Sequence, residues 1–153
     1  MTPSPTAVPT VPESPDRVFL DANVLFSAAY SPGSGLHRLW ELAQDGRIEL
    51  LASSYVVEEA RRNLTSGLQI QRLEKLLTRV RISACRARAG AAPAAEGLAQ
   101  KDRPFLQAAL AMDATHLLTG DIAHFGSLLG KWFEGVLVLL PGDYLSRTGK
   151  GAR

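Results

Sequence analysis

Short, continuously apolar runs separated by helical patterns are the feature of this sequence that most limits its fold. Strands that are apolar throughout, rather than at every second residue, are typical of parallel sheets covered on both faces. The segments between the runs space their apolar residues as helices do, and such helices connect parallel strands. The sequence therefore predicts an α/β fold, a three-layer α/β/α sandwich around a mostly parallel sheet of about five strands. The expected strands cover residues 17–21, 48–52, 81–85, 116–119 and 136–140, and the expected helices cover 35–44, 54–64, 70–80, 102–113 and 123–133.

The two ends of the chain differ from its middle in composition. Residues 1–16 contain five prolines and few large apolar side chains, so we expect a flexible tail there. Residues 147–153 are polar and contain glycine, and we expect a second flexible tail. A single domain is expected over residues 17–146.

Several classes of protein are disfavoured by what the sequence lacks. No apolar run approaches the roughly 18 residues that a membrane-spanning helix needs. Residues 1–16 do not have the pattern of a secretory signal. Cys85 is the only cysteine, so no disulfide can form within one chain. Together these features favour a cytoplasmic protein.

Charge leaves the nature of the partner open. The formal net charge is only +2, which neither requires nor excludes nucleic acid. Basic residues nevertheless cluster in one part of the sequence, and they could form either a phosphate-binding surface or a solvated face. The cluster comprises Arg72, Lys75, Arg79, Arg81, Arg86 and Arg88.

Acidic side chains follow the expected strands. Asp21 ends the first strand and Asp121 comes just after the fourth. Ligands of open parallel sheets gather at the carboxyl ends of the strands, so these two carboxylates are expected to converge there. Asp102, at the start of a helix, and Glu59, on the helix after the second strand, can reach the same place. Taken singly, Asp102 could be a helix cap, and Glu59 could pair with nearby arginines.

Four carboxylates in one place need a cation or protons to relieve their repulsion. Oxygen ligands without cysteine or histidine favour Mg²⁺ or Mn²⁺ over zinc. Such an ion can orient a phosphodiester and activate water. The residues therefore predict a Mg²⁺ (or Mn²⁺) site on Asp21, Glu59, Asp102 and Asp121.

Four segments carry a resemblance to the PIN-domain family, and particularly to its bacterial VapC-type toxins. The first is VFLDANVL, with Asp21 and then Asn23; the second is SSYVVEEARRNL, whose register selects Glu59 and not Glu58. The third and most specific is KDRPFLQAALAMDATHLLTGD, which contains Asp102 and Asp121. The closing GVLVLLPGDYL is similar to the last strand of the family.

The resemblance implies metal-dependent cleavage of RNA, with Asn23 orienting Asp21 or a water molecule and Thr119 supporting the site through its hydroxyl. Many relatives have another acid or amide after the fourth aspartate. Here those positions hold Ile122, Ala123 and His124, which leaves a fifth ligand and a role for His124 open. The implied partners are an RNA substrate, a cognate antitoxin protein and a second copy of the chain.

Other functions can also place acids at strand ends. A phosphoaspartyl phosphatase would need a second aspartate where Asn23 stands, and a receiver domain would need a phosphoacceptor and a later lysine that cannot be placed. A non-catalytic PIN domain that binds RNA or protein is the rival from a different class. Within the nuclease reading, a toxin and a stand-alone RNA-processing enzyme both remain open.

Overall fold

A computed structural model of the chain describes residues 14–84 and 103–151. Its strands form one six-stranded sheet, with the order β3-β2-β1-β4-β6-β5. Each pair of neighbours is parallel except β5 and β6, which are antiparallel. The predicted α/β fold with a mostly parallel sheet is confirmed, with one more strand than expected. The strands are β1 Asp16–Leu20, β2 Ile48–Ser53, β3 Val80–Ser83, β4 His116–Leu118, β5 Trp132–Phe133 and β6 Val136–Leu139.

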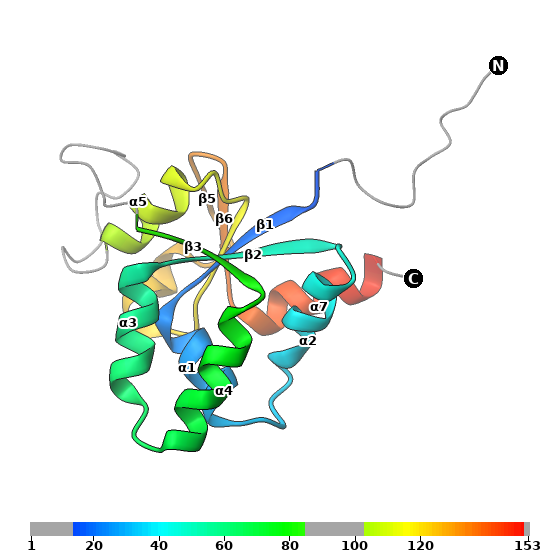
Figure 1. The fold of residues 1–153 in the computed structure, drawn as a ribbon. Coiled ribbons are helices and arrows are strands. Elements are labelled where there is room, and N and C mark those ends of the chain that lie inside the picture. The colour runs from blue at the N-terminus through cyan, green and yellow to red at the C-terminus, as the bar shows by residue number, and fades with distance from the viewer. Residues whose placement is uncertain (1–13, 85–102, 152–153) are drawn as a thin grey trace.

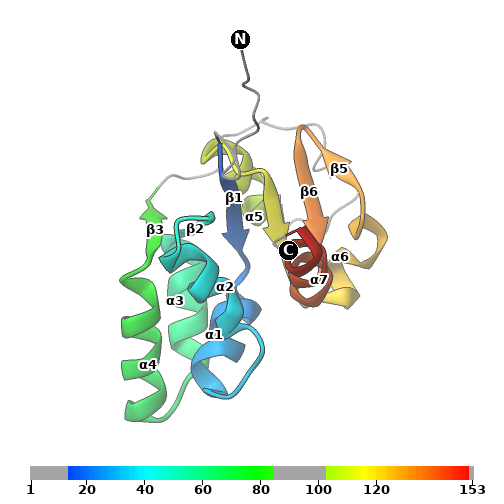
Figure 2. The same ribbon diagram turned by 90° about the vertical axis from the view of Figure 1, so that its right-hand side faces the viewer.

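Helices flank the sheet on both sides. In Figure 2, α2 and α7 lie in front of the sheet and α5 lies behind it. The helices α1, α3 and α4 pack against one another (Figure 1). No described helix is long and apolar enough to cross a membrane. The helices are α1 Ala22–Tyr30, α2 His37–Gln44, α3 Ser54–Asn63, α4 Gly67–Leu77, α5 Arg103–Ala111, α6 Ile122–Phe125 and α7 Pro141–Gly151, with a 3₁₀ turn over Gly126–Leu128.

The central strands are the core of the molecule. Val18, Phe19 and Leu20 of β1 are all fully buried. This is expected of a strand with covered faces on both sides, and it explains why the apolar run is continuous. From β1 the chain adds β2 and β3 on one side and β4 and β6 on the other. The switch of direction lies between β1 and β4, and ligands of such sheets bind at the carboxyl ends of the strands on either side of a switch.

Four features of the fold differ from those predicted. The helix expected over residues 123–133 stops early, and its last two residues form β5. Glu134 and Gly135 both have positive φ, 54° and 88°, which gives a two-residue hairpin turn between β5 and β6. Such turns match the twist of paired strands, so pairing with β6 outweighs the helical pattern.

The helices α1 and α7 were not predicted. Five of the nine residues of α1 are buried, so it lacks the clear polar face by which a surface helix is recognised. The helix α7 begins with Pro141 and has Asp143 in its first turn, both of which favour a helix start. It runs to Gly151, so the residues from 147 onward, expected to form a flexible tail, are helical to that point.

The helix α4 also lies earlier than predicted, because Ser66 caps it by accepting a hydrogen bond from the Gln69 N–H. Val80, expected as its last residue, instead begins β3. Residues 1–13, Cys85, Arg86, Arg88 and Asp102 lie outside the described residues. The expectations that concern them therefore have no structural counterpart here.

Candidate active site

Asp21 is fixed at the junction of β1 and α1. Its backbone is extended, and its Oδ1 accepts a hydrogen bond of 2.7 Å from the Ala22 N–H, so it is the N-cap of α1. Its own N–H donates to the Leu118 carbonyl of β4 at 3.0 Å. The side chain is only 3% exposed. Strand and helix together therefore hold this carboxylate at the switch point of the sheet.

Two neutral side chains bind the other oxygen of the carboxylate. Thr119, fully buried after β4, donates its hydroxyl to Asp21 Oδ2 at 2.8 Å, and Asn23 donates its amide to the same atom at 3.2 Å. The Thr119 hydroxyl also accepts from the Asp121 N–H at 3.0 Å. Thr119 thus links the two aspartates that follow β1 and β4.

Gly120 is a part of this network that the sequence analysis missed. Its N–H donates to Asn23 Oδ1 at 2.8 Å. A Cβ at this position would lie 3.4 Å from the same oxygen, so the loop passes close to the Asn23 side chain. The glycine between Thr119 and Asp121 was the available signal, since glycine is typical of close backbone approach.

The electrostatic surroundings of Asp21 are acidic. Burial raises the pKa of its carboxyl, and the hydrogen bonds from Thr119 and Ala22 lower it in part. Asp121 and Glu59 raise the pKa of Asp21 further through charge repulsion. No basic side chain among the described residues forms an ion pair with Asp21. The fold thus brings two of the other predicted acids, Glu59 and Asp121, within electrostatic reach of Asp21.

Glu59 lies on α3 with its side chain turned inward, whereas the neighbouring Glu58 is exposed. The Glu59 Oε1 atom is buried and accepts no hydrogen bond from any described residue. A buried carboxylate oxygen without a donor is costly, so an unfilled oxygen of this kind fits a site that receives a cation. This orientation agrees with the register that selected Glu59 over Glu58.

The donor set fits a hard divalent cation. Carboxylate, hydroxyl and amide oxygens are the ligands of Mg²⁺ and Mn²⁺, and the buried free oxygen of Glu59 is consistent with such a group. Within residues 14–84 and 103–151, no three His, Cys, Asp or Glu side chains form a group that could by itself hold a metal ion. Asp102, the fourth predicted acid, is not among those residues.

Two arginines of the basic cluster make separate contacts within the fold. Arg72 donates its Nε to the Ala29 carbonyl at 2.8 Å and so binds the end of α1. Arg81 forms an ion pair of 3.3 Å with Glu49. Arg72 and Arg81 are therefore occupied within the fold. His37, which contacts the Ala28 carbonyl at 2.9 Å, is likewise occupied within the fold.

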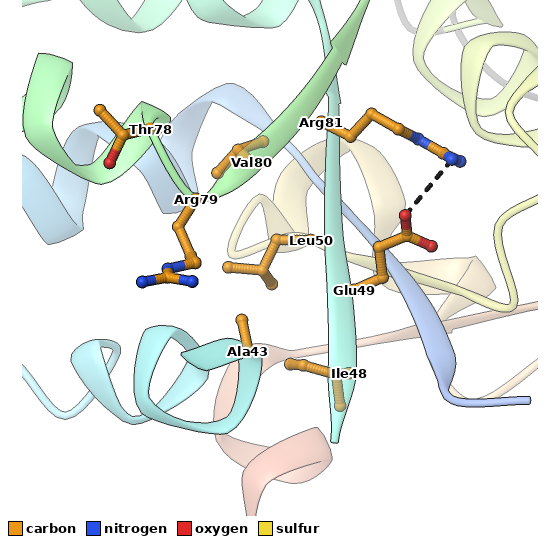
Figure 3. A pocket seen from close by; sticks show the side chains of 8 residues that line it. All are labelled: Ala43, Ile48, Glu49, Leu50, Thr78, Arg79, Val80 and Arg81. Carbon is orange, nitrogen blue, oxygen red and sulfur yellow. Dashed lines mark ion pairs between the residues drawn. The ribbon is translucent and has the colours of Figure 1, made fainter. Parts of the chain in front are cut away.

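A cavity of about 330 Å³ lies away from the acids, at the amino ends of β2 and β3. Figure 3 shows Arg79 over its apolar floor and Arg81 turned toward Glu49. Its only acidic lining residue is Glu49, so it lacks the carboxylates of the predicted site. Its lining residues are Ala43, Ile48, Glu49, Leu50, Thr78, Arg79, Val80 and Arg81.

Comparison with known proteins shows the fold and the family of the chain. The fold is similar to a chain in the crystal structure of VapBC2 from Rickettsia felis bound to a DNA fragment from their promoter, with a TM-score of 0.57 and 20% identity. The match covers 80% of this chain and 96% of that one. Comparison with curated protein sequences finds no match. The PIN-domain family model matches residues 17–123, so the chain belongs to the PIN-domain family, whose members are generally nucleases that typically use divalent metal ions.

Proposed function

We propose that this protein is a divalent-metal-dependent endoribonuclease, and the toxin of a toxin–antitoxin pair. The observation that carries the proposal is the Asp21 carboxylate, buried at the switch point of the sheet with acids but no described cation around it. A fold that desolvates a carboxylate and adds like charge beside it is destabilised unless something compensates. In a PIN domain, a metal ion bound by these residues would offset the repulsion between the carboxylates.

Asp21, Glu59 and Asp121 would hold Mg²⁺ or Mn²⁺, with Asp102 as the fourth acid. When bound, the ion would supply charge neutralisation for the phosphodiester and an activated water. The residues of the chain would provide the geometry. Thr119 and Asn23 fix one oxygen of Asp21 and Ala22 fixes the other, so the carboxylate cannot turn away. The Asp121 backbone is held by the Thr119 hydroxyl, which keeps the two aspartates in register.

The toxin role is supported by the family and by the likeness to the VapBC2 structure. That complex contains its toxin–antitoxin partners and promoter DNA. We propose that this chain likewise acts in the cytoplasm and is inhibited by a cognate antitoxin. Induction of the chain alone should arrest growth, and co-expression with a small neighbouring reading frame should relieve the arrest.

The nuclease activity is tested by titrating purified protein with Mg²⁺ or Mn²⁺ in the presence of a mixed RNA pool. We expect cleavage that rises with metal concentration and is abolished by EDTA. A DNA pool of the same lengths tests the choice of RNA, and Asp21→Asn tests for a contaminating nuclease. RNA that stays intact at every metal concentration, or is cut equally by the variant, would contradict the proposal.

A further inference from the structure

An exposed aromatic ring lies on the helix that carries Glu59. Tyr55 is the second residue of α3, directly after the carboxyl end of β2, and it is 51% exposed. A tyrosine with half of its surface in solvent, at the end of the sheet where ligands bind, is therefore a candidate binding residue.

The Tyr55 ring has a fixed position. It packs against Phe105 of α5, with 5.6 Å between the ring centroids and 40° between the planes. Phe105 is itself buried. The contact leaves another part of the Tyr55 surface in solvent, and its hydroxyl forms no hydrogen bond with any described residue. A ring that is supported on one side and open on the other can act as a stacking platform.

The ring is also close to Glu59. Tyr55 and Glu59 are four residues apart on α3, so they share one flank of the helix, with about 5–6 Å between their Cβ atoms. The contact with Phe105 shows that this flank faces α5, and Figure 1 shows the start of α3 and α5 on the same side of the molecule. A phosphodiester bound by the acids would therefore have its neighbouring base near the Tyr55 ring.

We infer that Tyr55 stacks on an unpaired base next to the cleaved bond and so positions the RNA strand at the site. This inference rests on the ribonuclease function proposed above. A base inside a duplex has both faces covered by its neighbours, so it cannot stack on a protein ring. Stacking on an aromatic side chain tolerates every base, so it positions the strand without selecting its sequence.

The test compares kcat/KM on an RNA strand, free or annealed to its complement, for wild-type protein, Tyr55→Phe and Tyr55→Leu in Mn²⁺. We expect Tyr55→Phe to retain activity on the free strand. Tyr55→Leu should lose about 5- to 100-fold on the free strand, mainly through KM, because base stacking is lost. Tyr30→Leu is the matched control. Tyr30 is 54% exposed and stacks on Phe26 at 5.4 Å, but it ends α1, far from Asp21 at the start of that helix.

A binding readout separates this inference from the proposed function. A strand containing 2-aminopurine should lose fluorescence on binding to wild-type protein and Tyr55→Phe, but not to Tyr55→Leu. If wild-type protein cleaves RNA while Tyr55→Leu is unchanged in both assays, the inference is wrong and the function stands. If wild-type protein neither cleaves RNA nor quenches the probe, both fail. If Tyr55→Leu converts a dimer to a monomer in sedimentation, the ring serves a second copy of the chain and the inference is overturned.

Discussion

The strand β1 carries an aspartate at each end, and the two have opposite surroundings. Asp16, its first residue, accepts a hydrogen bond of 2.7 Å from the Tyr144 hydroxyl and lies 3.9 Å from His116 Nδ1. Asp21, directly after its last residue, is buried with Glu59 and Asp121 as its charged neighbours. One aspartate thus has a partner within the fold, whereas the other has no ion-pair partner among the described residues.

Other charged side chains at the amino ends of the strands also have partners within the fold. Arg17 donates its Nε to the Asp113 carbonyl, and Arg81 pairs with Glu49. Burial lowers the pKa of His116, which Asp16 raises in part and Arg147 lowers. Charges that are paired within the chain serve its stability, whereas buried charges of one sign indicate a missing ligand. The difference between Asp16 and Asp21 therefore indicates that the functional site lies at the carboxyl end of β1. The variants below test this difference.

Neutralising Asp16 and Asp21 in turn should give the largest difference in activity between the two ends of β1. Since loss of a group that merely supports a metal ligand costs about 10- to 100-fold, Asp21→Asn should lower RNA cleavage by at least about 100-fold. Asp16→Asn should leave cleavage within about twofold but lower the Tm, because it weakens the acceptor of the Tyr144 hydroxyl. Cleavage rates and thermal melts measure both effects. Equal loss of activity in the two variants would remove the distinction between the ends.

The adjacent glutamates of α3 give a comparison within one helix. Glu59→Gln should strongly reduce cleavage, by about 10-fold or more, because it removes charge from the metal site. Glu58→Gln, whose side chain is exposed, should be nearly silent. The measurement is kcat/KM at saturating Mn²⁺, repeated at low Mn²⁺ to detect weakened metal binding. Greater damage from Glu58→Gln would show that the assignment along α3 is wrong by one residue.

Two threonines flank β4 in the same way as the aspartates flank β1. Thr119→Val keeps the shape but removes the hydroxyl between Asp21 and Asp121, so cleavage should fall about 10- to 100-fold.

Thr115→Val is the control for this variant. It removes a hydroxyl that accepts from the Arg17 N–H at 2.9 Å and should cost stability, about 1–3 kcal/mol, without loss of cleavage. Circular dichroism melts and cleavage assays distinguish the two. A Thr119→Val protein of full activity would show that the hydroxyl does not position the site.

The smallest expected effect is the pH dependence of stability in EDTA. The folded state raises the pKa of Asp21 above its ordinary 3.8, so it binds that proton more tightly than the unfolded chain does. Stability is therefore lost as the pH rises through the window between 3.8 and the raised value. Asp21→Asn lacks this loss, so its Tm relative to wild type should be higher at neutral pH than below pH 3.8.

His116→Gln should show the opposite slope. The folded state lowers the pKa of His116 below 6.5, so stability present above pH 6.5 is lost as the pH falls toward the folded value. The variant lacks that loss, and its Tm relative to wild type should rise toward acid. Parallel slopes for the two variants would contradict the directions of the two pKa shifts.

The sequence by itself determined the local features. Continuous apolar runs predicted five of the six strands, because a strand covered on both faces needs apolar side chains throughout. Asp21 and Asp121 were predicted as site residues from their places after such runs. The register of one helix selected Glu59, whose side chain turns inward while that of Glu58 is exposed. Each of these features depends on residues that are neighbours in the chain.

Tertiary structure decided what depends on distant partners. Thr119 and Asp21 are 98 residues apart, and they meet only because β4 lies beside β1 in the sheet. Trp132 and Phe133 lie in a segment with a helical pattern, but they form a strand that pairs with β6. The helix α7 buries Tyr144. The local signals for these elements were weak, and burial and strand pairing between distant segments contribute more free energy than local propensity does.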